Sequence, residues 1–289
     1  MGQANCCAAD SKNDNIVDMD KARKSEEEKQ KKREGILKKR ESQKKDKKGK
    51  KVKNEDEVQK DEEESKKYDL NDIDSLLPEA PTLHDMERNQ VNHEMVLTSR
   101  EKAIKYWDEM FSKEWKLNKE EEGIQIFTRP SESDTQKYTM RVMDLVSNKE
   151  YVATYLCNLE KEINAKKGVE KLTVVEDLGF NNKIIYMALK GTILLGSRGF
   201  VNCRTKYKLK NGDYLIVSHP VEHKDIPKTK NIRGALESLT WVQQNSDTEI
   251  RVTNMLRYDM KGSVPEANMK KLVDEQLAEY AYLKKNLNK

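Results

Sequence analysis

The stretch RVTNMLRYDMKGSVPEANMKKLV, residues 251–273, contains most of a strand, a chain reversal and the start of a helix. Apolar and polar residues alternate over 249–260, and this period of two is typical of a strand with two different faces. Ser263 and Glu266 form a capping-box pattern at the start of the helix. Pro265 is tolerated there because the first amides of a helix have no partner within it. The stretch therefore predicts a strand that reverses directly into a helix.

The predicted helix continues almost to the end of the chain and carries a single apolar stripe. The residues of this stripe are Met269, Leu272, Val273, Tyr280, Leu283 and Leu287, with Gln276 in the middle. A helix with one apolar face packs that face against the rest of the domain. The sequence thus predicts a long amphipathic helix laid over an apolar surface.

Seven further segments upstream also show strand periodicity. They are 123–130, 137–146, 171–178, 183–191, 198–209, 213–220 and 234–244. Asn211-Gly212 indicates a tight hairpin, because both residues tolerate positive φ, and short connections of this kind make a sheet antiparallel. Helical periodicity starts at Ser99 and again near 149–160. The prediction is an α+β fold, in which the C-terminal helix closes a curved antiparallel sheet around an apolar cavity.

The aromatic residues divide the chain into a tail and a domain. Of the 18 Trp, Tyr and Phe residues, only Tyr68 lies in the first third. We expect an N-terminal segment (1–19), a disordered charged tail (20–67), a linker (68–95) and one domain (96–289). The domain segment is long enough to build a core of its own, so we expect it to fold without the preceding residues.

Charge is distributed unevenly, although the formal net charge is only +4. Residues 20–53 contain 17 Lys and Arg against 7 Asp and Glu, and residues 54–67 contain 3 against 7. The domain, with 33 against 27, is only mildly basic. The basic block has no aromatic residue to stack on bases, so we expect no nucleic-acid partner.

Neither a membrane span nor a secretory signal is predicted. No stretch approaches the roughly 18–20 consecutive apolar residues of a membrane helix, and the first ten residues lack the regions of a signal peptide. The four cysteines, Cys6, Cys7, Cys157 and Cys203, show no pairing pattern in the domain. This pattern is typical of free thiols in a reducing compartment, so we expect a cytoplasmic protein.

Three stretches resemble the START lipid-transfer domain in residues, order and spacing. The first is SRGFV (197–201) followed by Arg204, the second is HPVEHKDIPKTKNIRGALESLTW (219–241), and the third is 251–273. In the third, Asp259, Gly262 and Pro265 match a strand that ends in Asp-x-x-Gly before x-x-Pro and the last helix. The resemblance implies a helix-grip fold that binds one lipid between the sheet and the C-terminal helix.

Eight residues are candidates for lining this lipid site. They are Arg204, Trp241, Met255, Tyr258, Met269, Val273, Gln276 and Tyr280. Arg204 takes the family's inward-facing polar position, where it would hold a headgroup or hydroxyl; the alternative is a solvated face shared with Lys206. In the family's sterol-binding branch a carboxylate pairs with this arginine, and here Ile185 or Leu189 occupies that region. The resemblance therefore favours a phospholipid over a sterol.

A mobile gate is expected at Ile193, Leu194 and Leu195, because Gly191 and Gly196 bracket these three aliphatic residues. Glycines supply freedom at a hinge, and exposed aliphatic side chains supply contact with a membrane. The alternative is that these side chains fill the interior.

The first seven residues, MGQANCC, resemble a double-acylation signal. Gly2 would take myristate after removal of Met1, and Cys6 and Cys7 would take palmitate. A single myristoyl chain gives only marginal membrane binding, so a second chain is needed for stable attachment. The alternative is two ordinary thiols. Acylation would place the protein on the cytosolic face of a membrane, with its basic block beside anionic lipids.

These observations indicate a membrane-tethered protein that binds one lipid and transfers or senses it, and we expect it to be a monomer. The alternative is a structural module whose interior is filled by its own side chains and whose tail recruits partners. No catalytic motif or cofactor site is predicted. No metal site is predicted at His219 and His223 either, because Pro220 lies between them and nothing completes a ligand set.

Overall fold

The computed structural model describes residues 70, 72–82, 84–85, 93–131, 133, 135–166, 168–191, 196–226, 229–262 and 264–288, with the backbone only at 93, 266 and 269–273. The chain divides into two units, Met1–Glu64 and Ser65–Lys289, and the description concerns the second. The expected N-terminal segment (1–19) and charged tail (20–67) lie outside the described residues.

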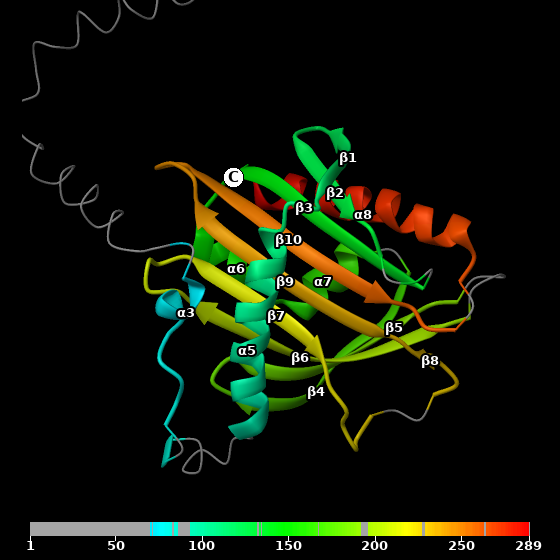
Figure 1. The fold of residues 1–289 in the computed structure, drawn as a ribbon, viewed down its shortest axis with the longest axis horizontal. Coiled ribbons are helices and arrows are strands. Elements are labelled where there is room, and N and C mark those ends of the chain that lie inside the picture. The colour runs from blue at the N-terminus through cyan, green and yellow to red at the C-terminus, as the bar shows by residue number, and fades with distance from the viewer. Residues whose placement is uncertain are drawn as a thin grey trace, which may run out of the picture. The chain divides into compact units, whose positions relative to one another are not determined.

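One curved sheet forms the centre of the unit (Figure 1). Its strands lie in the order β1 (Lys116–Glu121), β2 (Ile124–Arg129), β3 (Gln136–Val146), β10 (Glu249–Asp259), β9 (Ala235–Gln244), β7 (Tyr214–Pro220), β6 (Arg198–Lys208), β5 (Asn182–Leu189) and β4 (Val169–Gly179). Neighbours along this path are antiparallel, and the short β8 (Ile232–Arg233) pairs in parallel with β6. All eight predicted strands are present and the fold class is confirmed, whereas β1 and β8 were not predicted.

Each central strand has two covered faces. On β9, Leu239 and Trp241 point to the side on which helix α5 (His93–Met110) packs, which we call the outer face. Ser238 and Thr240 point to the opposite side, which we call the inner face. Side chains alternate between the two faces because the strand period is two.

The outer face is covered by α5 and by a short helix, α3 (Ile73–Leu76) (Figure 1). The shared core contains Ile73, Leu76, Leu77, Ala103, Tyr106, Trp107, Met110, Leu209, Leu215, Val217, Leu239, Trp241 and Met255. Ile73 is 3% exposed, and Leu76 and Leu77 are 0% exposed. The segment 68–95, expected to be a linker, therefore contributes side chains to the core of the domain.

The inner face is covered by three helices: α6 (Lys149–Leu156), α7 (Leu159–Ala165) and α8 (Glu266–Leu287). Sequence periodicity predicted one helix near 149–160, and the structure has two. Asn148 and Asn158 cap them, accepting hydrogen bonds from the amides of Tyr151 and Lys161. The side chain of Asn158 thus starts a second helix one turn after the first ends.

The C-terminal helix begins at Glu266 with Pro265 at the N-cap, and no side chain caps it. Pro265 takes the N-cap position, and Ser263, which was predicted to cap the helix, lies outside the described residues. The turn before it has positive φ at Lys261 and Gly262. The Arg198 guanidinium donates to the carbonyl oxygens of Met260 (2.8 Å) and Lys261 (3.1 Å), which fixes the reversal.

The predicted hairpin at Asn211-Gly212 joins β6 to β7. Only Gly212 has a positive φ, of 81°, and the amide of Leu209 donates to the carbonyl oxygen of Asp213 at 2.8 Å. Three residues thus form the loop instead of two, with glycine at the position that favours left-handed backbone.

Among the helices that the structure describes, none has the length and apolar character needed to cross a membrane.

Candidate functional site

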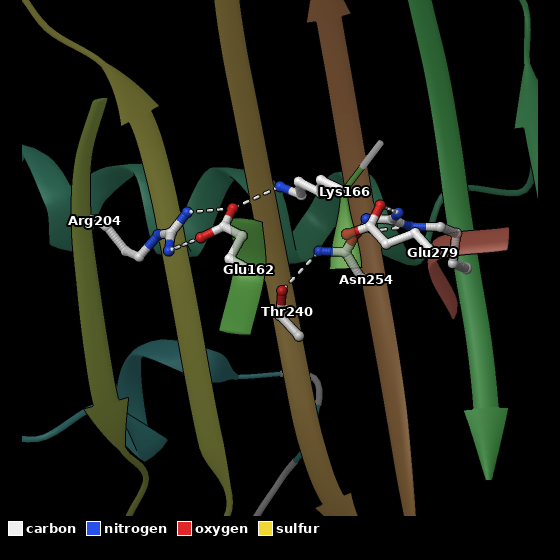
Figure 2. Close-up of polar contacts among 7 residues, drawn as sticks. Glu162, Lys166, Arg204, Thr240, Asn254 and Glu279 are labelled. Atoms are coloured by element: carbon white, nitrogen blue, oxygen red, sulfur yellow. Dashed lines mark hydrogen bonds and ion pairs between the residues drawn. The ribbon is translucent and has the colours of Figure 1, made fainter. Parts of the chain in front are cut away.

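The inner face carries a buried charged cluster, which we call the inner cluster. Its members are Arg141, Glu162, Lys166, Arg204, Thr240, Asn254 and Glu279 (Figure 2). They come from α7, from α8 and from four strands: β3, β10 and β9, which are neighbours, and β6, which β7 separates from β9. The interior of the grip is thus polar at its centre, which differs from the expected apolar cavity.

One half of the inner cluster joins α7 to β6. The Arg204 guanidinium donates to both carboxylate oxygens of Glu162, at 2.6 and 3.1 Å. The Lys166 ammonium, one turn further along α7, donates to the same carboxylate at 2.6 Å. The Glu162 side chain is 9% exposed, so one buried carboxylate is shared by two cations. Bidentate arginine–carboxylate pairs are among the strongest hydrogen-bonded contacts in proteins.

The other half joins α8 to β3 and β10. The Arg141 guanidinium donates to the Glu279 carboxylate at 2.8 Å and, through Nε, to the Asn254 side-chain oxygen at 3.1 Å. The Asn254 amide in turn donates to the Thr240 hydroxyl at 2.7 Å. Arg141 also lies over the ring of Tyr280, 4.2 Å from its centroid. The long helix is therefore attached to the sheet by a polar network as well as by apolar packing.

The electrostatics of the inner cluster are set by burial and by the ion pairs together. Burial by itself would raise the pKa of Glu162, but attraction to Arg204 and Lys166 outweighs it, so this pKa lies well below its usual range. Burial alone would likewise lower the pKa of Lys166, and the nearby Glu162 and Glu279 raise it instead. Glu162 and Lys166 are therefore both ionised at neutral pH.

Little free volume remains around these groups. A cavity of about 70 Å³ is walled by members of both halves of the cluster, and one of about 50 Å³ lies beside Tyr258 and Gln276. Pockets for small ligands usually measure ~300–1,000 Å³. The interior is thus too small for a lipid in this conformation.

A larger cavity lies beside the corner between α6 and α7, on the inner-face side of the sheet but outside the interior. We call it the outer cavity; it is not on the outer face that α5 covers. Its volume is about 470 Å³, and its wall includes Cys157, Leu159, Lys183, Arg204 and Lys206. Arg204 also lines the 70 Å³ cavity. The outer cavity and the interior are therefore separated at the ion pair between Arg204 and Glu162.

Gln276 is the most unusual polar residue of the interior. Its side chain is 4% exposed, and neither its amide nitrogen nor its oxygen has a hydrogen-bond partner among the described residues. It lies on the wall of the 50 Å³ cavity with Tyr258 and Lys166. A buried amide without partners costs free energy, so this position is suited to a polar ligand group or to water.

Four of the eight predicted lipid-site residues meet on the inner face: Arg204, Tyr258, Gln276 and Tyr280. Trp241 and Met255 do not, because both lie in the core of the outer face, where Trp241 packs on Trp107 of α5. These two predictions are wrong, because Trp241 and Met255 point to the outer face of their strands and not to the inner face. The side chains of Met269 and Val273 are outside the described part of α8.

The remaining predicted positions lie outside the described residues. These are the gate Ile193, Leu194 and Leu195 and the acylation positions Gly2, Cys6 and Cys7. The orientation of Arg204 is settled in favour of the inner face, and its carboxylate partner, Glu162, comes from α7. Ile185 lines the outer cavity, as expected for a position on the inner face of β5.

Sequence reasoning missed most members of the inner cluster: Arg141, Glu162, Lys166, Asn254 and Glu279. Glu162 and Lys166 are four residues apart on α7 and look like an ordinary solvated ion pair of a helix surface. One signal was present in β3, where Arg141 occupies an apolar position between Thr139 and Met143. A charge at a core position of a strand indicates a buried partner.

On the outer face, the Ser99 hydroxyl lies 3.0 Å from His219 Nε2 and 3.5 Å from the Cys203 sulfur. All three side chains are buried beneath α5. Burial lowers the pKa of His219 to about 4, so the ring is neutral at pH 7. His223 lies apart from this group and contacts Glu176 at 2.7 Å. The described residues contain no group of three or more side chains placed to hold a metal ion.

Comparison with solved structures identifies folds similar to this one. Human StAR-related lipid transfer protein 5 is 16% identical, with a TM-score of 0.60, and the match covers 68% of this chain and 98% of that chain. The lipid transfer and protein localization domain of human StarD13 is 20% identical, with a TM-score of 0.53 and the same coverage. Human STARD10 is 18% identical, with a TM-score of 0.53, covering 72% and 79%. A search of curated protein sequences found no match.

The family comparison concerns the sequence itself. The START domain model matches residues 98–286, which is more than half of the chain. This range begins within α5 and ends within α8, so it includes the whole sheet and the inner cluster. The chain therefore belongs to the START domain family.

Proposed function

We propose that this protein binds a single lipid between the inner face of its sheet and helices α7 and α8, and that it transfers or senses this lipid at a membrane. The observation that carries the proposal is the family match over residues 98–286, which spans the sheet and the helices that close it. Two of the similar solved structures, human StAR-related lipid transfer protein 5 and the StarD13 domain, are named for lipid transfer, which supports the same assignment.

Uptake of a lipid requires the grip to open, because the two interior cavities measure only about 70 and 50 Å³. The C-terminal end of α8 is held firmly: the Lys284 ammonium donates to the Glu122 carbonyl oxygen at 2.7 Å, and the Val146 amide donates to the Asn288 side chain at 2.7 Å. At its other end α8 has no side-chain cap. We propose that opening pivots about the C-terminal end, with Ile193, Leu194 and Leu195 acting as the gate.

The polar interior supports a phospholipid more than a sterol. Arg204 is already neutralised by Glu162, and Ile185, on the strand before, offers no carboxylate to share with a single hydroxyl. The inner cluster instead offers several charged groups together with the unpartnered amide of Gln276. Such a set matches a headgroup with more than one polar atom.

Attachment to a membrane is a separate part of the proposal, based on Gly2, Cys6 and Cys7. Extracting an acyl chain from a bilayer costs about 0.8 kcal/mol for each CH₂ group exposed to water. A protein held at the membrane surface would receive the lipid directly, so the chain would not have to cross water. We propose a cytoplasmic location on this surface and a non-catalytic role.

A second candidate function is supported by a specific observation. Among the residues that the structure describes, ion pairs occupy the centre of the interior, and the two cavities beside them are smaller than the usual ~300–1,000 Å³. A fold filled by its own side chains would serve as a structural or interaction module, with the charged tail recruiting partners.

Native mass spectrometry of the full chain, purified from its own cells, distinguishes the two. We expect one lipid per protein. Ser238→Leu would fill the 70 Å³ cavity with an apolar side chain and should reduce the fraction of protein that carries a lipid severalfold. Gln243→Leu, on the same strand but facing outward, should leave it unchanged. A protein free of lipid that also moves none between vesicles would support the interaction module instead.

A further inference from the structure

The outer cavity differs from the interior in both size and charge. Three cationic side chains on its wall, Lys183, Arg204 and Lys206, come from the adjacent strands β5 and β6. Glu160 is the carboxylate among the residues that line it. The apolar part of the wall is supplied by Leu159, Val174 and Ile185. A volume of about 470 Å³ is within the usual range for a ligand site.

The cationic groups are engaged to different degrees. Lys183 contacts Asp177 at 3.3 Å, and both side chains are more than half exposed, so the pair is weak. Lys206 forms no ion pair with any residue that the structure describes. Arg204 is fully occupied by Glu162 in bidentate geometry. The cavity therefore has one available cation and one arginine that is held by an internal carboxylate.

That internal carboxylate occupies the position in which a bound anion would lie. Glu162 accepts hydrogen bonds from Arg204 and Lys166 and lines the 70 Å³ cavity, while Arg204 lines both that cavity and the outer cavity. A phosphate or carboxylate presents oxygens with the same spacing to a guanidinium. If the phosphate or carboxylate of a ligand replaced the Glu162 carboxylate on Arg204, Arg204 and Lys166 would both remain paired. The contact that holds α7 to β6 would then be released.

We propose that the outer cavity binds a phosphate or carboxylate group, which takes the place of Glu162 on Arg204 and thereby frees α7. This inference rests on the proposed function and extends it: the ligand is an anionic amphiphile, and it approaches the interior at the corner between α6 and α7. Its apolar chain would follow Leu159 and Ile185 toward the inner face of the sheet.

Cys157 provides a native reporter, because its thiol lies on the wall of the outer cavity and is partly exposed, while Cys203 is buried. The full chain is incubated with nonionic maltoside micelles that carry phosphatidic acid, or diacylglycerol with the same acyl chains, or with inorganic phosphate alone. The alkylation rate of Cys157 is then read by peptide mass spectrometry, with Cys203 as the internal reference.

Phosphatidic acid should slow the alkylation of Cys157, and diacylglycerol should not. Protection by phosphatidic acid alone identifies a lipid as the source of the anion, and equal protection by inorganic phosphate identifies the free ion; both outcomes support the site. Equal effects of phosphatidic acid and diacylglycerol would overturn it while leaving the proposed lipid binding intact. If neither lipid binds at all, the proposed function itself fails.

Substitutions test the exchange with Glu162. Glu162→Gln removes the competing carboxylate and should raise the affinity for phosphatidic acid about tenfold. Asp144→Asn is the matched control, because Asp144 accepts from Arg251 in the same bidentate geometry away from the grip. Unchanged affinity in a folded Glu162→Gln protein would contradict the exchange.

A second pair of variants keeps the test decisive if Glu162→Gln does not fold. Lys206→Gln should weaken binding of phosphatidic acid severalfold without lowering the melting temperature. Lys208→Gln, two residues along the same strand, should not, since Lys208 does not line the outer cavity and shares with Lys206 only a second cavity of about 290 Å³ beside Pro78 and Tyr207. An effect of Lys208→Gln equal to that of Lys206→Gln would place the anion elsewhere and overturn the proposal.

Discussion

Glu162 shows how much a single residue of α7 determines in this interior. Its carboxylate accepts from both Arg204 and Lys166 in a site where its side chain is 9% exposed. Removing one partner of a buried ion pair typically costs about 3–5 kcal/mol, because the other charge is left without compensation. The cluster therefore holds α7 in place, and whatever replaces this carboxylate has to bring its own negative charge.

His219 has a comparable role on the outer face, where it is buried between β7 and α5. Its Nε2 contacts the Ser99 hydroxyl at 3.0 Å, and its pKa is lowered to about 4, chiefly by burial. In the unfolded chain the imidazole has its ordinary pKa of 6.5. Between these two values the unfolded state binds more protons, so the stability that the neutral ring provides is lost as the pH falls.

We therefore expect the free energy of unfolding to fall by roughly 2.5 kcal/mol, through His219 alone, between pH of about 7.5 and about 4.5. The measurement is urea unfolding at both pH values for the wild type and for His219→Gln, which retains a side chain able to bond Ser99 but does not titrate. The wild type should lose more stability than the variant. Equal losses would mean that other groups account for the acid sensitivity.

At the scale of elements, period-two patterning was sufficient to predict eight strands, but not the face to which each residue points. Both faces of β9 and β10 are buried, so alternation could not tell the inner face from the outer one, and Trp241 and Met255 were assigned to the wrong side. β1 was missed because its sequence, KLNKEE, is almost entirely polar, as suits an exposed edge strand.

The inner cluster was hidden for a related reason. A charged residue on a short helix usually faces solvent, and nothing in the sequence near Glu162 or Lys166 indicates that α7 lies over the sheet. Arg204 was identified only because the family resemblance marks its position. Pairings between elements far apart in the sequence, such as Arg141 with Glu279, depend on packing that local patterns do not contain.

The short helix α3 leads to a prediction about where the folded domain begins. A chain that starts at residue 96 would lack Ile73, Leu76 and Leu77, which are at most 3% exposed. Burying a large aliphatic side chain contributes about 1.5–3 kcal/mol, so the shortened protein, which lacks three of them, should lose roughly 4–9 kcal/mol of stability. Thermal unfolding of chains that begin at residues 65 and 96 measures this difference.

Two point variants separate packing from chain length. Leu76→Ala in the full chain should lower the melting temperature by several degrees, whereas Leu70→Ala, at a position that is 46% exposed, should not. Equal melting temperatures for the chains that begin at 65 and 96 would restore the simpler expectation of a linker before residue 96.

At the scale of the whole molecule, the two faces of the sheet serve different purposes. The outer face is closed by α3 and α5 over an apolar core that includes Trp107 and Trp241. The inner face is closed by α6, α7 and α8 over charged groups and small cavities at its centre and over an apolar core that includes Leu283 and Leu287. A polar interface separates at a lower cost in exposed apolar area than a hydrophobic core does, so motion is expected at the charged centre of the inner face, around α7.

The N-terminus is expected to determine whether the whole molecule is attached to a membrane. Gly2→Ala replaces the N-terminal glycine that myristoylation requires, and without this first chain the thiols of Cys6 and Cys7 should not reach a membrane to be acylated. We expect the wild type to pellet with membranes and Gly2→Ala to be recovered in the soluble fraction.

The double variant Cys6→Ser/Cys7→Ser is the informative control. It retains one myristoyl chain, whose binding constant of about 10⁴ M⁻¹ should give partial and reversible pelleting. Since residues 1–19 lie outside the unit Ser65–Lys289, we expect all three proteins to have the same melting temperature, and the mass of the N-terminal peptide reports each acyl group directly. Wild-type pelleting by Gly2→Ala would show that the protein is held by something other than its N-terminus.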